Sequence, residues 1–231
     1  MKITFGQYDT KIMNRILSLG FSPFLILATD SLILILLNTI LQKYGGKSQG
    51  DMFITCATIA QSYLLLITSS MIGISGGTQA ILSYNYGARR ADRVKDAERN
   101  ILGVMLIFTT IMFLLSRLVP RYFVLLFTSD PQYISFSVWA IHTYTLMIIP
   151  LSFQYVFVDG LTALDRPKTG LALSVTRKSL FVLSAAILPV FFDAKAAFFA
   201  EPVADGVCSV LSTVVFLLLI NRHLQKRCQT V

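Results

Sequence analysis

The feature that most constrains this chain is a series of apolar stretches long enough to cross a lipid bilayer. A membrane-spanning helix needs about 20 consecutive, mostly apolar residues. The chain is 55% hydrophobic and only 14% charged, with a mean hydropathy of +0.67, whereas an ordinary soluble domain has about 25% charged residues. The composition therefore predicts an all-α, polytopic membrane protein.

Gaps between charged residues predict six transmembrane helices within a single domain of residues 1–231. The helices are expected at about 21–41, 57–86, 100–127, 133–158, 169–192 and 200–221. The fifth is the weakest of the six, because Arg177 and Lys178 interrupt it. We expect Pro150 to bend the fourth helix, and residues 88–99 to form an amphipathic connector along the inner membrane surface.

Lys and Arg are distributed unevenly between the two sides of the membrane that six crossings imply. Fifteen of the 20 fall on the side that holds both termini and the connections after the second and fourth helices. Because cytoplasmic loops are enriched in Lys and Arg, we place both termini in the cytoplasm and the chain in the plasma membrane, which in a bacterium is the inner membrane. The same distribution accounts for the net charge of +8 without a nucleic-acid partner.

The sequence contains no motif of a known enzyme class. Its three cysteines, Cys56, Cys208 and Cys228, have no C-x-x-C spacing, and only two histidines accompany them. A P-loop, a nucleophile elbow and a glycine-rich dinucleotide fingerprint are also missing. We therefore expect no enzymatic activity, no metal site and no cofactor.

Several segments together resemble one known family. GGTQAILSYNYGARRADRVKDAERN (76–100) is similar to the second helix and following loop of a lobe of the multidrug and toxic compound extrusion (MATE) family, and most similar to its MepA/DinF-like branch. Other matching segments follow in the family's order: LGFSPFLILATDSL, LFTSDPQ, IIPLSFQYVFVDGLTALDRPKTGLALSVTRKSL and FFAEPVADGVCSV. The resemblance covers nearly the whole chain.

The resemblance also indicates an incomplete transporter. Members of the MATE family contain two six-helix lobes, joined in one chain around a central cavity. This chain resembles one of these lobes, the C-terminal one. Three readings remain open: a different chain supplies the other lobe, a second copy does so, or the sequence is a fragment of a longer transporter. In each reading membrane lipid surrounds the chain, and the first two require a partner lobe.

Asp30 is the strongest candidate for a functional residue. It is the only ionisable residue in FSPFLILATDSLILILLNTI (21–40), and a charged carboxylate at the centre of a spanning helix costs about 2.5–3.5 kcal/mol. A carboxyl group there could take a proton from one side and release it to the other. The resemblance points the same way, because some family members carry an acidic residue at this position that is implicated in coupling to H⁺ or Na⁺. The alternative is a neutral Asp that only fixes helix packing.

Four further residues are candidates for lining a substrate cavity. Gln154 follows Pro150, and Asn38 lies in the first predicted helix. The alternative for each is a hydrogen bond to a neighbouring helix that stabilises packing without contact with substrate. Arg177 could form a charge pair or extend to the cytoplasmic interface. Asp205 lies one turn after Glu201 and could simply sit at the outer interface.

The resemblance implies secondary active efflux of amphipathic or cationic drugs and toxic compounds. The expected mechanism is H⁺- or Na⁺-coupled antiport with alternating access of two lobes. Two alternatives remain: a lobe without transport activity, acting as a subunit or arising from truncation, and a flippase for lipid-linked precursors.

Overall fold

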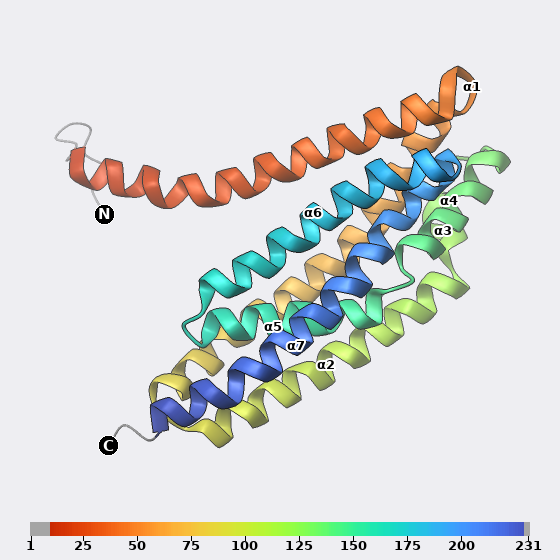
Figure 1. Cartoon of the computed structure of the whole chain (residues 1–231). Helices are drawn as coiled ribbons and strands as arrows, with labels where there is room; N and C mark the ends of the chain where they lie inside the picture. The colour runs from red at the N-terminus through yellow and green to blue at the C-terminus, as the bar shows by residue number, and fades with distance from the viewer. Residues whose placement is uncertain (1–9, 229–231) are drawn as a thin grey trace, which may run out of the picture.

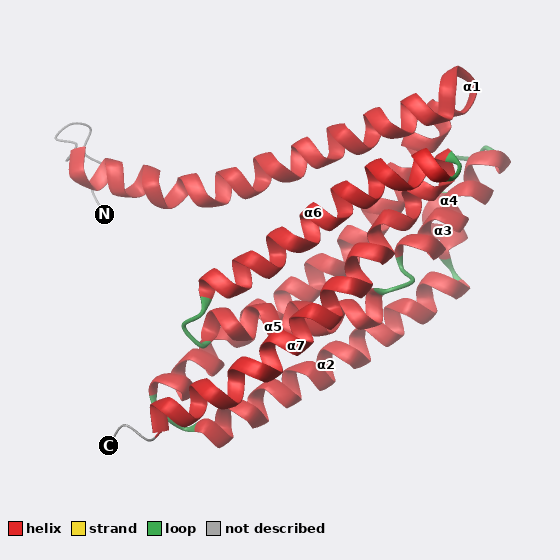
Figure 2. Cartoon of the chain, in the orientation of Figure 1, coloured by secondary structure: helices red, strands yellow, loops and turns green. Residues whose placement is uncertain are grey.

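The computed structural model describes residues 10–228, without the side chains of 11–12, 14–30, 47–48 and 221–228. Over this range the chain is helical and has no strand (Figure 2). The elements are α1 (Thr10–Gly87), α2 (Ala91–Leu118), α3 (Pro120–Val124), α4 (Pro131–Tyr144), α5 (Ile148–Ala163), α6 (Pro167–Phe191), the 3-10 helix η1 (Ala194–Phe199) and α7 (Ala200–Cys228). The predicted all-α fold is confirmed.

A tight turn divides α1 into two antiparallel helices, which corresponds to the boundary predicted between the first two spans (Figure 1). Gly46 has φ 65° and ψ −171°, a conformation that favours glycine. Gly45 allows the two helices to approach closely, since a Cβ atom there would lie 2.8 Å from both the Gly50 Cα and the Phe53 Cδ2. The turn therefore depends on glycine at two successive positions.

We expect Gly45→Ala to destabilise the protein by about 1–3 kcal/mol, because the added methyl group meets the backbone of Gly50 and the buried ring of Phe53. Gly73→Ala is the matched control, since a Cβ atom at this helical glycine meets nothing within 4 Å and Ala is the better helix former. Thermal unfolding of the purified variants compares them. Equal stability of the two variants would contradict this account of the turn.

Prolines set several helix boundaries. The helix predicted over 100–127 ends instead at Leu118, because Pro120 has no N–H to donate to the Ser116 carbonyl. The short helix α3 then begins at Pro120. Pro131 and Pro167 begin α4 and α6, where a missing N–H costs nothing. The Asp130 side chain also caps α4 by accepting a hydrogen bond from the Gln132 N–H at 2.8 Å.

The predicted fourth span is broken, but not at Pro150. The chain leaves the helix at residues 145–147, between α4 and α5, and the two helices are inclined at 47°. Pro150 lies in the first turn of α5, where backbone N–H groups have no partner within the helix. The proline is thus accommodated at the start of a new helix instead of bending a continuous one.

The connector predicted at 88–99 is not a separate element. The chain turns at Ala88–Arg90, with Arg89 at φ 58°, and α2 then runs without interruption from Ala91 into the apolar part of the helix. Asp92, Arg93, Lys95, Asp96 and Arg99 are exposed, as an amphipathic segment requires. The exception is Glu98, which is buried.

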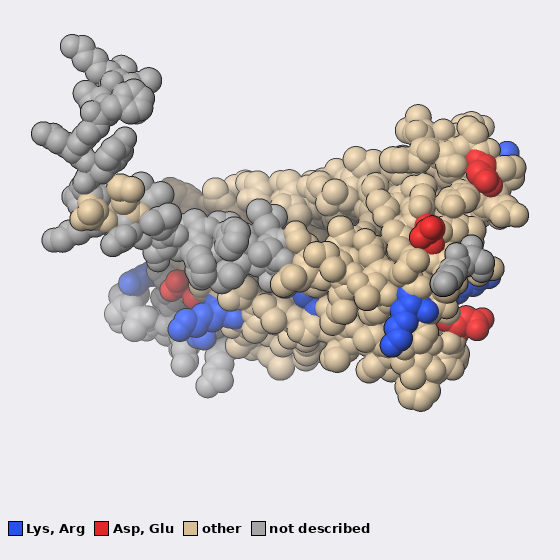
Figure 3. Space-filling model, turned by 90° about the horizontal axis from the view of Figure 1, so that it is seen from above, with Lys and Arg blue, Asp and Glu red and all other residues tan. Residues whose placement is uncertain are grey.

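The helices pack with α5 in contact with α1, α2, α6 and α7. Among the described residues, four helices are long and apolar enough to cross a membrane, and the bent pair α4–α5 forms a fifth candidate. The first predicted span, 21–41, lies largely among residues whose side chains are not described. On the face seen in Figure 3, charged side chains gather toward the two ends and leave the middle almost free of them, as expected for a protein that crosses a bilayer.

Candidate functional site

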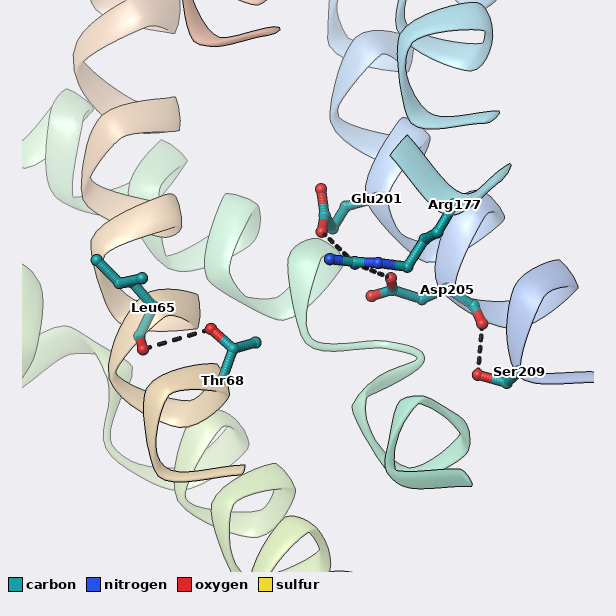
Figure 4. A network of polar contacts seen from close by, with 6 residues as sticks. All are labelled: Leu65, Thr68, Arg177, Glu201, Asp205 and Ser209. Carbon is teal, nitrogen blue, oxygen red and sulfur yellow. Dashed lines mark hydrogen bonds and ion pairs between the residues drawn. The ribbon is translucent and has the colours of Figure 1, made fainter. Parts of the chain in front are cut away.

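An ion-pair network between α6 and α7 is the clearest polar site within the bundle. Glu201 and Asp205 are four residues apart on α7 and therefore share one face of that helix. Arg177 of α6 lies between their carboxylates (Figure 4). Its Nη1 is 2.6 Å from the Asp205 Oδ1 and 3.3 Å from the Glu201 Oε1. We call Arg177, Glu201 and Asp205 the charge triad.

The charge triad is largely removed from solvent. The Asp205 side chain is 1% exposed, that of Glu201 15% and that of Arg177 22%. The second Asp205 oxygen, Oδ2, is buried and has no hydrogen-bond partner among the described residues. When all three groups are ionised, two carboxylates face one guanidinium, so the triad carries one unit of uncompensated negative charge. Such a charge is costly within an apolar bundle.

Helix α5 carries two further polar residues, Gln154 and Tyr155. Tyr155 is close enough to interact electrostatically with all three of its members. Its neighbour Gln154 is 4% exposed, and the Gln154 side-chain oxygen has no hydrogen-bond partner in the described part of the chain. An unsatisfied buried amide costs free energy, so Gln154 remains a candidate for contact with a ligand.

The structure brings together two of the residues proposed from sequence and leaves the others apart. Arg177 and Asp205 form a direct ion pair, and Asp205 is buried. Asn38 is half-buried in α1. Asp30 also belongs to α1, but its side chain lies outside the described residues.

Glu201 was not proposed as a site residue, although a signal for it was present. It precedes Asp205 by four residues at the start of a predicted span, and two carboxylates at that spacing must lie side by side on a helix. Within the described residues, no group of three or more His, Cys, Asp or Glu side chains is placed to hold a metal ion.

The fold is that of known transporters. A solved inward-facing multidrug resistance MATE family transporter of the MOP superfamily superposes with a TM-score of 0.84 at 16% identity, over 97% of this chain and 51% of that one. A MOP superfamily transporter from Pyrococcus furiosus, described as having a binding pocket of reverse polarity, superposes with a TM-score of 0.78 at 16% identity, over 94% of this chain and 48% of that one.

Similarity of sequence identifies the family. The fold and the predicted spans define a multi-pass membrane protein built like one half of a MATE-type transporter. The MatE family model matches residues 26–188, more than half of the chain, so the chain belongs to that family. An FAD transporter from Shewanella oneidensis is 26% identical over 136 residues, which are 59% of this chain and 29% of that protein. The chain spans about half the length of the solved transporters.

Proposed function

We propose that this chain is a secondary active efflux transporter, or one half of one, that exports amphipathic or cationic compounds in exchange for H⁺ or Na⁺. The observation that carries the proposal is the charge triad, which holds excess negative charge inside a MatE-family lobe. A proton on a triad carboxylate, or a monovalent cation beside it, would neutralise that charge. A cationic substrate would neutralise it equally well, so substrate and coupling ion would compete, as antiport requires.

Alternating access then follows from two charge states of the same helix pair. With the ion bound, α6 and α7 enclose a neutral site, which favours close packing and exclusion of water. Without it, the uncompensated charge favours water or a cationic substrate and therefore a more open arrangement. Asp30 is proposed as a second coupling carboxyl group in α1, on the grounds of its isolation in an apolar sequence.

A second lobe is part of the proposal, because the chain spans only about half of the solved transporters. Either a different chain or a second copy of this one would supply it. The exposed apolar side chains of α1 after Ser31, among them Leu32 and Ile35, are available to either lipid or such a lobe.

Export of a flavin nucleotide is a second candidate, favoured by the sequence similarity to the FAD transporter. FAD is an anion, however, and needs positive charge in its site. The Arg177 guanidinium is already paired with two carboxylates, so the triad favours cations over anions.

Reconstitution of the purified chain into lipid vesicles tests the proposal. We expect an imposed proton or sodium gradient to drive movement of a fluorescent lipophilic cation, and Asp30→Asn to abolish it because the coupling carboxyl group is lost. FAD in place of the cation tests the second candidate. Asp165→Asn is the control, since Asp165 is an exposed loop residue at φ 64° where Asn is well tolerated.

Failure of the wild-type chain to move either compound would overturn a self-sufficient transporter and favour a lobe that needs a partner or does not transport. Gradient-driven movement that persists unchanged in Asp30→Asn would overturn the role of Asp30 but not the transport function.

A further inference from the structure

A second buried carboxyl group, Glu98, lies near the beginning of α2, away from the charge triad. The buried residues Val94, Ile101 and Met105 are spaced along the same face of α2, and Glu98 falls in register with them. It is 5% exposed, and neither of its carboxylate oxygens has a hydrogen-bond partner in the described part of the chain. The Glu98 carboxyl group therefore points into the bundle, where none of the described residues forms a hydrogen bond with it.

The absence of a side chain at Gly160 makes room for this carboxyl group. A Cβ atom on Gly160 of α5 would clash with the Glu98 Oε1 and lie 3.0 Å from its carboxyl carbon. The Glu98 carboxyl group thus packs directly on the backbone of α5. The contact is made at the end of the bundle where α1 ends, α2 begins and α5 ends (Figure 1), which is the predicted cytoplasmic end.

Asp159, the residue before Gly160, is the charged group that faces Glu98. Among the described residues it is the one whose charge acts on Glu98, and it lies near the polar side chains of Ser75 and Gln79 of α1. The other charged residues in this part of α2 are exposed. The surroundings of the two carboxyl groups therefore differ: Asp159 lies near polar side chains, whereas neither oxygen of the buried Glu98 has a hydrogen-bond partner among the described residues.

We propose that Glu98 and Asp159 form a proton-binding site at this end of the bundle, with the proton held on Glu98. An ionised Glu98 would be a buried charge without a partner beside a second carboxylate, and both effects are costly. The bound proton removes both, so that α2 can pack against Gly160. Loss of the proton drives α2 away from α5. A test of this site does not depend on the transport activity proposed above, because proton binding can be measured on the purified chain alone.

The pH dependence of thermal unfolding in detergent tests the site. Above the pH at which an exposed glutamate ionises, the folded protein holds a proton that the unfolded chain has released, so stability falls as the pH rises. One proton corresponds to roughly 3 °C in unfolding temperature per pH unit for a chain of this size. Glu98→Gln keeps the shape but cannot ionise, so we expect it to reduce this slope by the contribution of one proton. Asp96→Asn, an exposed carboxyl group on the same helix, should keep it.

Infrared spectroscopy supplies a measurement that does not depend on the stability of a variant. The wild-type protein should show the carbonyl band of a protonated carboxyl group at neutral pH. The band should lose the contribution of one carboxyl group in Glu98→Gln and stay unchanged in Asp96→Asn. Asp159→Asn removes the neighbouring negative charge, so the band should persist but disappear at lower pH than in the wild type.

Three results would overturn the proposal. One is a pH slope in Glu98→Gln equal to that of the wild type. Another is the absence of a protonated-carboxyl band from the wild-type protein at neutral pH. The third is stabilisation of the wild type by Na⁺ at alkaline pH that Glu98→Gln abolishes, which would assign the site to a metal cation instead of a proton.

Discussion

Replacing Arg177 with Met is expected to lower the stability of the protein by about 3–5 kcal/mol, the usual cost of removing one partner from a buried ion pair. The substitution keeps the unbranched apolar stem of the side chain but removes the guanidinium group and its positive charge. Asp205, 1% exposed, and Glu201, 15% exposed, would then be two adjacent buried carboxylates without a counter-charge. Thermal unfolding of the purified variant in detergent measures the loss.

A second substitution separates loss of the ion pair from loss of packing. If the cost comes from unpaired carboxylates, adding Asp205→Asn to Arg177→Met should recover part of the lost stability, because the more deeply buried charge is removed with its partner. Lys168→Met is the control: Lys168 is an exposed residue in the first turn of the same helix, and its replacement should change stability by less than about 0.5 kcal/mol. A loss in Arg177→Met no greater than in this control would contradict the ion pair.

The all-α class of the fold could be predicted from the sequence because the bilayer dictates it. Long uncharged stretches can be satisfied in lipid only as helices, but this does not locate the helix ends. The apolar helix expected from residue 57 begins at Gln49, and the one expected to end at residue 221 continues to Cys228. The break between α4 and α5 could not be located in this way. Pro150 is a visible signal, but the break at 145–147 depends on how the two halves pack against their neighbours.

The charge triad could be predicted only in part. From the sequence, a charge pair was one of two interpretations of Arg177, and Asp205 could equally have been an interfacial carboxylate. That they are partners of each other depends on the rotation of α6 relative to α7, which a single sequence does not encode in any short pattern. Glu98 was hidden for a different reason: it stands among exposed charges in 88–99, and only its register with the apolar face of α2 distinguishes it.

Phe198 joins the last connection of the bundle to its core. It lies in η1, between α6 and α7, and is 1% exposed. Its ring makes edge-to-face contacts with four aromatic residues of α1 and α4, at centroid distances of 5.3–6.4 Å: Phe53, Phe136, Trp139 and Tyr144. These contacts fix the point at which α7, with Glu201 and Asp205 in its first turns, begins.

Phe198→Ala is therefore expected to destabilise the protein by about 3–5 kcal/mol through the cavity that it leaves. Phe199→Ala is a control in the adjacent position: Phe199 is 41% exposed and contacts the Trp139 ring at 6.1 Å, so its loss should cost no more than about 1 kcal/mol. Thermal unfolding in detergent compares the two variants. If they lose equal stability, η1 is not held by Phe198, and the position of the charge triad must depend on the direct packing of α6 against α7.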